Sequence, residues 1–191
     1  MIFPGGLRLG INELLFVFGH DDHGIIVVSR RKTWEEKLAD KNGYPKVLVL
    51  EEGFPCYRAL NKMGAEAGDS VVLVNPSEIV PLMAQVPYGK VTTLREICQR
   101  IARGHAVEGC CTLTTGIHVM TAANAAAEAS ERGEDRNLPY WRTLKIDGYL
   151  NQKYPGGVED QARRLQAEGH QIVGKGKNAR LNDLERNLFR F

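Results

Sequence analysis

Residues 92–105 read TTLREICQRIARGH and carry the full pattern of an amphipathic helix. Thr93 and Glu96 have the spacing of a capping box, in which both side chains bond the backbone at the start of a helix. Apolar residues recur at helical spacing and predict one buried stripe, made of Leu94, Ile97, Cys98, Ile101 and Ala102. The opposite face carries Arg95, Gln99, Arg100 and Arg103. This stretch therefore predicts a helix that packs on a core through one face and presents basic residues on the other.

Further elements are predicted on both sides of this helix. Asn75-Pro76-Ser77-Glu78 supplies an N-cap, a proline at the first helical position and a glutamate at the third, and predicts a helix that Pro81 kinks. Residues 114–130 are rich in alanine and predict the second helix of a pair. Small side chains suit a recognition helix, and they suit tight packing against neighbouring helices at least as well. Alternation and an Asp147-Gly148 turn within residues 143–149 predict a hairpin of the wing type.

The first part of the chain predicts a small α/β element without a functional interpretation. Short apolar runs bounded by polar and turn residues are typical of strands, and capped polar stretches are typical of helices. Strands are expected at residues 14–18, 24–28, 46–50 and 71–74, and helices at 33–41 and 57–63.

Three motifs in the second half lie in the order found in one family of DNA repair proteins. They are Val86–Thr93 (VPYGKVTT), Pro139–Arg142 (PYWR) and Tyr154–Glu159 (YPGGVE), the last followed by Arg164–Gly169. They resemble the opening of the helix-turn-helix, the reactive tetrapeptide and the Tyr-x-Gly-Gly turn of the alkylguanine DNA alkyltransferases and alkyltransferase-like proteins. The resemblance implies an α/β protein. It implies a small N-terminal α/β extension at residues 1–75, a winged helix-turn-helix domain of alkyltransferase type at 76–173 and a basic C-terminal tail at 174–191.

The acceptor cysteine of that family is absent from the tetrapeptide. Tyr140 stands in its place, and a tyrosine hydroxyl, with a pKa of about 10, does not replace a thiolate as the acceptor of an alkyl group. The resemblance thus implies a non-enzymatic protein that binds alkylated or distorted duplex DNA and flags it for a downstream repair protein. The family's base-flipping tyrosine falls at Leu94 and its inserted arginine near Ile117 or His118, so base flipping does not carry over directly.

The resemblance also assigns a lesion pocket and a DNA-contact surface. Aromatic faces stack on an extruded base, and the pocket residues implied are Pro139, Tyr140, Trp141, Arg142 and Tyr154. Phosphate contacts supply most non-specific affinity for DNA, and the contact residues implied are Lys90, Thr93, Arg95, Arg100, Arg103, Thr114 and Thr115. The alternatives are that Tyr140 and Trp141 are core aromatics and that the basic residues form a solvated face.

Composition and charge limit the function only mildly. The chain has 191 residues, 43% of them hydrophobic and 25% charged, which is ordinary globular usage, and its net charge of +2 gives no global signal for nucleic acid. Four cysteines without paired spacing fit free thiols in a reducing cytosol. We expect a cytoplasmic protein without a membrane partner, because the sequence has neither a signal peptide nor an apolar run of about 20 residues. No cofactor is implied.

Three other functions fit parts of the sequence. The first is a protein-interaction or regulatory module that keeps the winged helix as a scaffold and has lost lesion binding. The second is a cysteine-dependent alkyltransferase that uses Cys111. The third is a metal site in His20-Asp21-Asp22-His23, which has ligand residue types but also the polar composition of a solvated turn.

Overall fold

A computed structural model describes residues 30–40, 43–134 and 136–191, and residues 34–191 form one compact unit. The strands predicted at 14–18 and 24–28 and the His20–His23 turn lie outside the described residues. In chain order the helices are α1 (Trp34–Ala39), α2 (Tyr57–Asn61), α3 (Pro76–Gln85), α4 (Leu94–His105), α5 (Thr112–Glu131), α6 (Gly157–Ala167) and α7 (Leu184–Asn187). The strands are β1 (Lys46–Val49), β2 (Ser70–Leu73), β3 (Thr92–Thr93), β4 (Gly109–Cys110), β5 (Thr143–Leu144), β6 (Ile172–Val173) and β7 (Arg180–Leu181).

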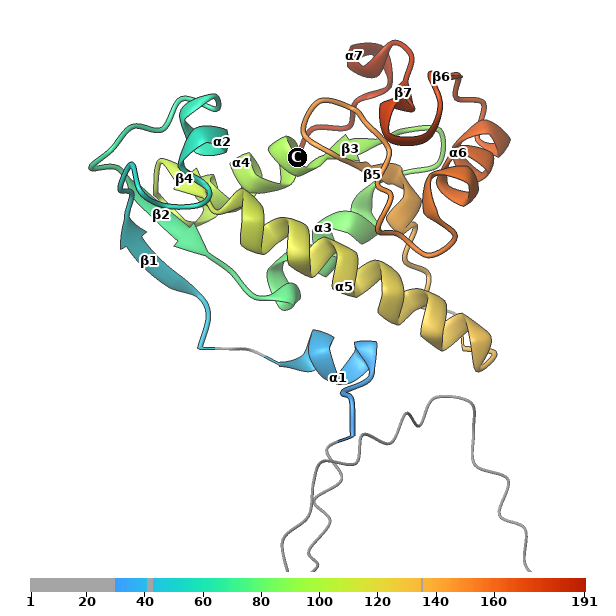
Figure 1. Cartoon of the computed structure of the whole chain (residues 1–191), viewed down its shortest axis with the longest axis horizontal. Coiled ribbons are helices and arrows are strands. Elements are labelled where there is room, and N and C mark those ends of the chain that lie inside the picture. Colours follow the sequence, from blue (N-terminus) through green and yellow to red (C-terminus); the bar gives the residue numbers. More distant parts are fainter. Residues whose placement is uncertain (1–29, 41–42, 135) are drawn as a thin grey trace, which may run out of the picture. The chain divides into compact units, whose positions relative to one another are not determined.

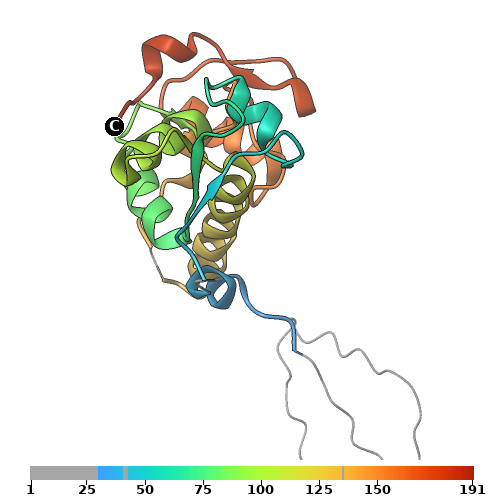
Figure 2. The same cartoon turned by 90° about the vertical axis from the view of Figure 1, so that its left-hand side faces the viewer.

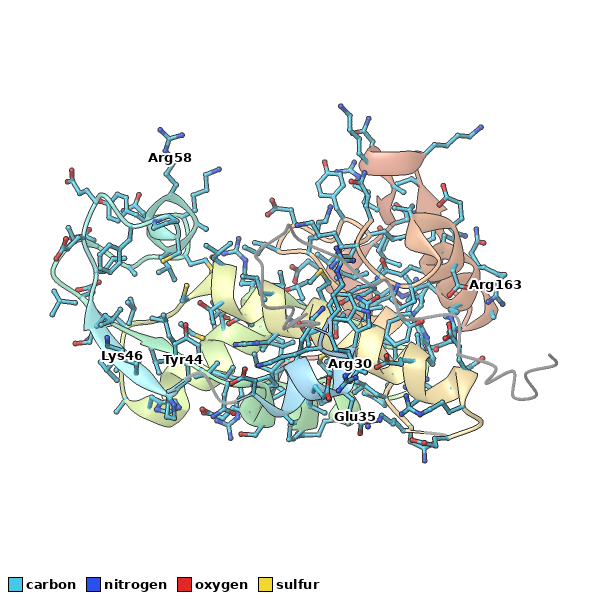
Figure 3. The ribbon with its side chains drawn as sticks, turned by 60° about the horizontal axis from the view of Figure 1, so that its bottom comes forward. Arg30, Glu35, Tyr44, Lys46, Arg58 and Arg163 are labelled. Carbon is cyan, nitrogen blue, oxygen red and sulfur yellow. The ribbon has the colours of Figure 1, made fainter. Side chains whose placement is uncertain are left out.

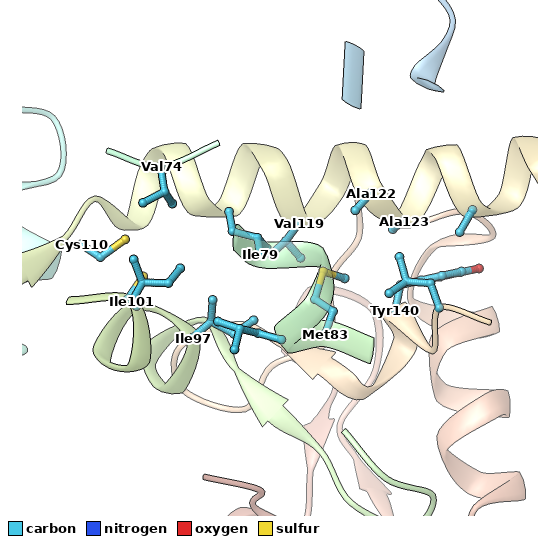
Figure 4. Close-up of a cluster of buried hydrophobic side chains, with 14 of the residues drawn as sticks. Val74, Ile79, Met83, Ile97, Ile101, Cys110, Val119, Ala122, Ala123 and Tyr140 are labelled. Carbon is cyan, nitrogen blue, oxygen red and sulfur yellow. The ribbon is translucent and has the colours of Figure 1, made fainter. Parts of the chain in front are cut away.

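The long helix α5 is the axis of the unit, with α1, α3 and α4 packed against it (Figure 1). Its alanines form a smooth face in the main core: Ala122, Ala123 and Ala126 belong to one buried cluster with side chains of α3 and α4. Figure 4 shows Ala122 and Ala123 on this face. The alanine-rich composition therefore serves tight helix packing, which was the alternative to a recognition surface. The predicted helix is confirmed, and it begins two residues earlier than the sequence indicated, at Thr112.

The predicted caps and the buried stripe of α4 are confirmed. The Asn75 side chain accepts a bond from the Ser77 N–H at 2.9 Å, and the Thr93 hydroxyl accepts one from the Glu96 N–H at 3.4 Å. Among the stripe residues Leu94 is half-buried, and Ile97, Cys98, Ile101 and Ala102 are buried. The stripe fixes which face of α4 meets α5 and leaves Arg100 and Arg103 exposed.

A three-stranded sheet connects the first part of the chain to the helix pair. Its strand order is β1-β2-β4, with β1 antiparallel and β4 parallel to β2. Strand β4 comes from the segment between α4 and α5 and pairs with Val71 and Val72 of β2; directly after β4, the Cys111 N–H donates to the Val72 carbonyl at 2.9 Å. Residues 46–73, assigned from sequence to an N-terminal extension, are thus built into the same unit as the helices.

The segment predicted as a wing has a different pairing from the hairpin expected. A turn is present, because the Lys145 N–H bonds the Tyr149 carbonyl at 2.9 Å and Gly148 has φ +79°. Strand β5, however, pairs in parallel with β3, and Tyr149 bridges to Arg180 instead of closing a two-stranded wing. The parallel pair joins the start of α4 to the segment after Arg142.

The C-terminal residues are packed into the unit. Ala179 and Leu181 are buried in a second core cluster with Val158 and Leu165 of α6. Beyond them the chain pairs with the segment before α4, where the Phe189 N–H bonds the Val91 carbonyl at 2.7 Å. Figures 1 and 2 show this C-terminal segment (red) and α1 (blue) at opposite ends of the unit. In the described part of the chain, no helix has both the length and the apolar character needed to cross a membrane.

Candidate functional site

Three sequence-distant motifs meet at the carboxylate of Glu168, at the end of α6. The side chain of Glu168 is 5% exposed and accepts bonds from the Trp141 indole N–H at 2.6 Å and the Gly89 N–H at 3.1 Å. It also pairs with the Arg142 guanidinium, whose Nε lies 2.9 and 3.0 Å from the two carboxylate oxygens. The VPYGK, PYWR and α6 motifs therefore form one site, which their spacing in the sequence did not reveal.

Arg142 holds this site together rather than facing a ligand with a free guanidinium. Its side chain is 13% exposed, and its Nη1 donates to the Val86 carbonyl at 2.8 Å in addition to the pair with Glu168. The Tyr88 hydroxyl adds a bond to the Ala167 carbonyl at 3.0 Å. These contacts fix the loop before α4 against the end of α6. These bond partners of Arg142 are internal, so it acts as a clamp between the two segments; its contact with a lesion stays a prediction.

A cavity of about 670 Å³ opens beside this clamp. Pro139, Tyr140, Trp141 and Arg142 form one wall, and Asp160 and Arg164 of α6 form another. The end of α5 and the loop after it close the remaining side, with Ala126, Ala127, Ser130 and Leu138 among the lining residues. A volume of this size is typical of small-molecule sites and exceeds that of one nucleobase. The structure thus brings four of the five predicted pocket residues to one cavity.

Tyr140 is a core residue that contributes an edge to the cavity. It is 5% exposed and belongs to the main core cluster, at the end furthest from Cys110 (Figure 4). Its ring meets those of Trp141 and Tyr154 edge to face, each at 5.5 Å between centroids. Burial raises the pKa of the Tyr140 phenol, so it remains a neutral hydroxyl at physiological pH. A ring so enclosed has little free face on which a base can stack.

Trp141 and Arg164 form the more accessible part of the aromatic wall. The Arg164 guanidinium lies over the Trp141 ring, 4.8 Å from its centroid, and 5.7 Å from the centroid of Tyr140. Asp160 holds it there through a 2.6 Å contact to Nε. Asp160 and Arg164 were not predicted as site residues, although their i, i+4 spacing was a usable signal. Any base that enters the cavity meets Trp141 together with this cation.

The Tyr-x-Gly-Gly turn has a structural role that explains its residues. Gly156 has φ +71°, and a Cβ at this position would lie 2.5 Å from the Cβ of Asp160. A side chain here would push Asp160, and with it Arg164, out of the wall. Tyr154 does not line the cavity: it is 4% exposed and its hydroxyl donates to the Thr143 carbonyl at 2.9 Å. The prediction of Tyr154 as a pocket residue is corrected, because this internal bond turns its polar end into the protein.

Two of the predicted DNA contacts are not accessible. Thr93 is 2% exposed as the N-cap of α4, and Thr115 is fully buried with its hydroxyl 3.4 Å from the Cys110 sulfur. Their hydroxyls bond partners inside the protein, so the prediction that Thr93 and Thr115 contact phosphates directly is corrected. Thr114 is half-buried, and its hydroxyl donates to the Cys111 sulfur at 3.3 Å.

The predicted basic contacts remain at the surface. The Lys90 ammonium bonds the Arg186 carbonyl at 3.0 Å, and Arg103 bonds the Phe191 carbonyl at 3.2 Å. Arg95 lies 3.9 Å from the exposed Asp147 carboxylate, and Arg100 is exposed without an ion pair to any described residue. These four residues are spread over α4 and the loop before it, and they do not converge on a single point.

The positions aligned with the family's inserted arginine differ in exposure. Ile117 is 50% exposed on α5, next to Leu113 at 51%, one turn before it. His118 is buried, its Nε2 has no partner among the described residues, and burial lowers its pKa. An apolar surface therefore stands on α5 where the family resemblance predicts a cation.

None of the four cysteines, all of them within the described residues, lines the cavity. Each is at most 6% exposed. Burial raises the pKa of Cys56 to about 11, which opposes formation of a thiolate. Cys111 caps α5 and is 5% exposed, so an alkyl group on a base has no open path to its sulfur. In the described ranges, no group of three or more histidine, cysteine or acidic residues is placed to hold a metal ion.

Comparisons with known proteins found likeness at the level of structure only. No protein-family model and no curated protein matches this chain. The structure is similar to that of S. pombe ATL in complex with DNA, with 17% identity, a TM-score of 0.42, and coverage of 60% of this chain and 94% of that one. It is also similar to S. pombe Atl1 in complex with damaged DNA containing O6-carboxymethylguanine, with 22% identity and the same TM-score and coverages.

Proposed function

We propose that this protein binds duplex DNA, recognises an alkylated or otherwise distorted base in the cavity beside Trp141, and marks it for repair without removing the alkyl group. The observation that carries the proposal is the meeting of three motifs. The PYWR motif and the YPGGVE motif with its following helix line one cavity, whose described lining has aromatic residues and no thiol. The VPYGKVTT motif is bonded to them beside the cavity, through Glu168 and Arg142. The motifs resemble those of the alkyltransferase-like proteins in sequence. The convergence supports that resemblance independently, because spacing along the chain does not require the motifs to meet.

The chemistry of the cavity suits a polar aromatic ligand. Arg164 over Trp141 offers a cation and aromatic surface together, and Glu134 supplies a carboxylate from the segment after α5. Bases stack on aromatic rings and on guanidinium planes without regard to sequence. A base carrying a lesion is extruded at lower cost than a paired one, which gives selectivity without a chemical step.

The two tryptophans of the chain provide a matched test. Both Trp34 and Trp141 are half-buried, but only Trp141 lines the cavity. We expect Trp141→Leu to lose most of the preference for a duplex with O6-methylguanine over the unmodified duplex, because stacking contributes roughly 1–3 kcal/mol per base. Trp34→Leu should keep the preference. Equal preference in both variants, measured by competition with fluorescent duplexes, contradicts the assignment of the cavity.

Trp141→Phe separates stacking from structure. This variant keeps an aromatic ring but loses the N–H that donates to Glu168 at 2.6 Å. If the ring contributes by stacking, most of the lesion preference survives while the melting temperature falls. If only the bond to Glu168 matters, Trp141→Phe loses the preference as fully as Trp141→Leu.

A protein-interaction module on the same scaffold is the second candidate function. The exposed Leu113 and Ile117 on α5 favour it, because neighbouring apolar side chains on a surface mark protein contacts more often than DNA contacts. Failure of the unmutated protein to bind any duplex, together with binding to a protein partner that Ile117→Asp abolishes, supports this candidate over the first.

A further inference from the structure

A second groove, of about 450 Å³, lies between α2, the start of α4 and the turn after β5. Arg58 and Lys62 come from α2, Arg95 from α4, and Ile146 and Asp147 from the turn. Among the described residues that line this groove, three are cations and one is a carboxylate. Two of the cations belong to the first part of the chain, for which the sequence suggested no role.

The cations of α2 are placed together by helix geometry. Arg58 and Lys62 are four residues apart, and the backbone stays helical through Lys62, with φ −64° and ψ −16°. Residues at this spacing lie on the same face of a helix, one turn apart. Both side chains are exposed, and neither forms an ion pair with any residue that the structure describes. Figure 3 shows Arg58 pointing away from the body of α2.

The remaining charges do not neutralise this groove. Asp147 is 3.9 Å from Arg95, but its side chain is 75% exposed and that of Arg95 is 33% exposed, so the pair is weak. Like charges gathered without counter-charges repel one another, and an anion that binds between them removes the repulsion. The groove therefore fits an anionic ligand.

The position of the groove identifies the anion. Arg95 at the start of α4 is one of the predicted DNA contacts, and the turn at 145–148 lies in the segment that the sequence predicted as a wing. We infer that the groove holds a phosphate of the duplex backbone and that α2 extends the DNA-contact surface beyond the helix pair. This inference rests on the proposed duplex binding and assigns its contacts to Arg58 and Lys62.

The test measures binding of the full chain to an unmodified duplex over a series of salt concentrations. Each phosphate neutralised adds about 0.9 to the slope of log affinity against log salt. We expect Arg58→Gln and Lys62→Gln each to reduce the slope by about one unit, which corresponds to roughly eightfold weaker binding at about 0.1 M salt. Lys46→Gln is the matched control, because Lys46 is an exposed cation of β1 outside the groove (Figure 3).

Three outcomes separate this inference from the proposed function. Reduced slopes for both α2 variants, with an unchanged ratio of affinities for alkylated and unmodified duplexes, support the inference, because phosphate contacts do not read the lesion. Slopes equal to that of Lys46→Gln overturn it while leaving duplex binding by the unmutated chain intact; an acidic protein surface then becomes the ligand to test. Absence of duplex binding by the unmutated chain overturns both.

Discussion

Removal of the Glu168 carboxylate, directly after α6, should strongly destabilise the protein. Glu168 is 5% exposed and receives the Arg142 guanidinium, the Trp141 indole N–H and the Gly89 N–H. In Glu168→Ala the Arg142 charge remains 13% exposed and retains only its bond to the Val86 carbonyl. Removing one partner of a buried ion pair costs about 3–5 kcal/mol, a large part of the 5–15 kcal/mol that is usual for total stability.

Urea unfolding followed by far-ultraviolet circular dichroism measures this loss. Glu159→Ala is the control, since Glu159 is an exposed glutamate of the same helix and should change the free energy of unfolding by less than about 1 kcal/mol. The double variant Arg142→Leu/Glu168→Leu should recover about 1–3 kcal/mol relative to Glu168→Leu alone, because it no longer buries an unpaired charge. A loss below about 1 kcal/mol for Glu168→Ala, or no recovery in the double variant, refutes the clamp.

Three further results are expected. Tyr140→Ala should cost about 3–5 kcal/mol of stability and weaken binding to alkylated and unmodified duplexes alike, because Tyr140 is 5% exposed in the core. Selective loss of lesion binding would show instead that its ring contacts the base. Burial lowers the pKa values of His118 and His170, so the unfolded chain binds protons more readily than the folded one, and stability should fall as the pH drops from 7 to about 5. The resulting decrease in melting temperature should be smaller in His118→Gln. An unchanged decrease in this variant contradicts a lowered pKa of His118. Incubation with a duplex carrying isotope-labelled O6-methylguanine should leave all four cysteines unlabelled, since each is at most 6% exposed, and label on Cys111 would establish an alkyltransferase.

Local patterns in the sequence predicted the helices well. The caps at Asn75 and Thr93 and the apolar stripe of α4 each depend on residues within one or two turns, and the structure has all three. Such signals are readable because helix bonds and helical faces are set by near neighbours. Strand predictions at 46–50 and 71–74 agree with the structure within one residue at each end, because short apolar runs bounded by turn residues are also a local signal.

Pairings over long distances were not predictable in this way. Strand β4 has two residues, too few for any periodic signal, and it is defined by its pairing with Val71 and Val72, far away in the sequence. The parallel pairing of β5 with β3 was missed because alternation over residues 143–149 suggested a local hairpin. Length and pattern alone do not identify a partner strand whose paired residues are 51 positions away in the chain.

The sequence predicted which segment contributes to the candidate site, but not how its side chains are arranged. The motif resemblance led to Pro139, Tyr140, Trp141 and Arg142, which do line one cavity. The polar ends of Trp141 and Arg142 bond the Glu168 carboxylate, and this arrangement was not predictable. In the sequence, Glu168 is indistinguishable from any other charged residue near the end of a helix. Burial of Thr93 and Thr115 was equally hidden, because a threonine that caps or packs looks the same in sequence as one that binds DNA.

The affinity of the unmutated protein for a duplex with one O6-methylguanine, divided by its affinity for the same duplex without it, tests the central claim most directly. We predict a ratio of about ten or more, which corresponds to about 1.4 kcal/mol and lies within the range of base stacking. The ratio should stay constant as salt rises, since both duplexes present the same phosphates and the electrostatic contribution cancels. A ratio of one at every salt concentration contradicts recognition of the lesion in the cavity beside Trp141.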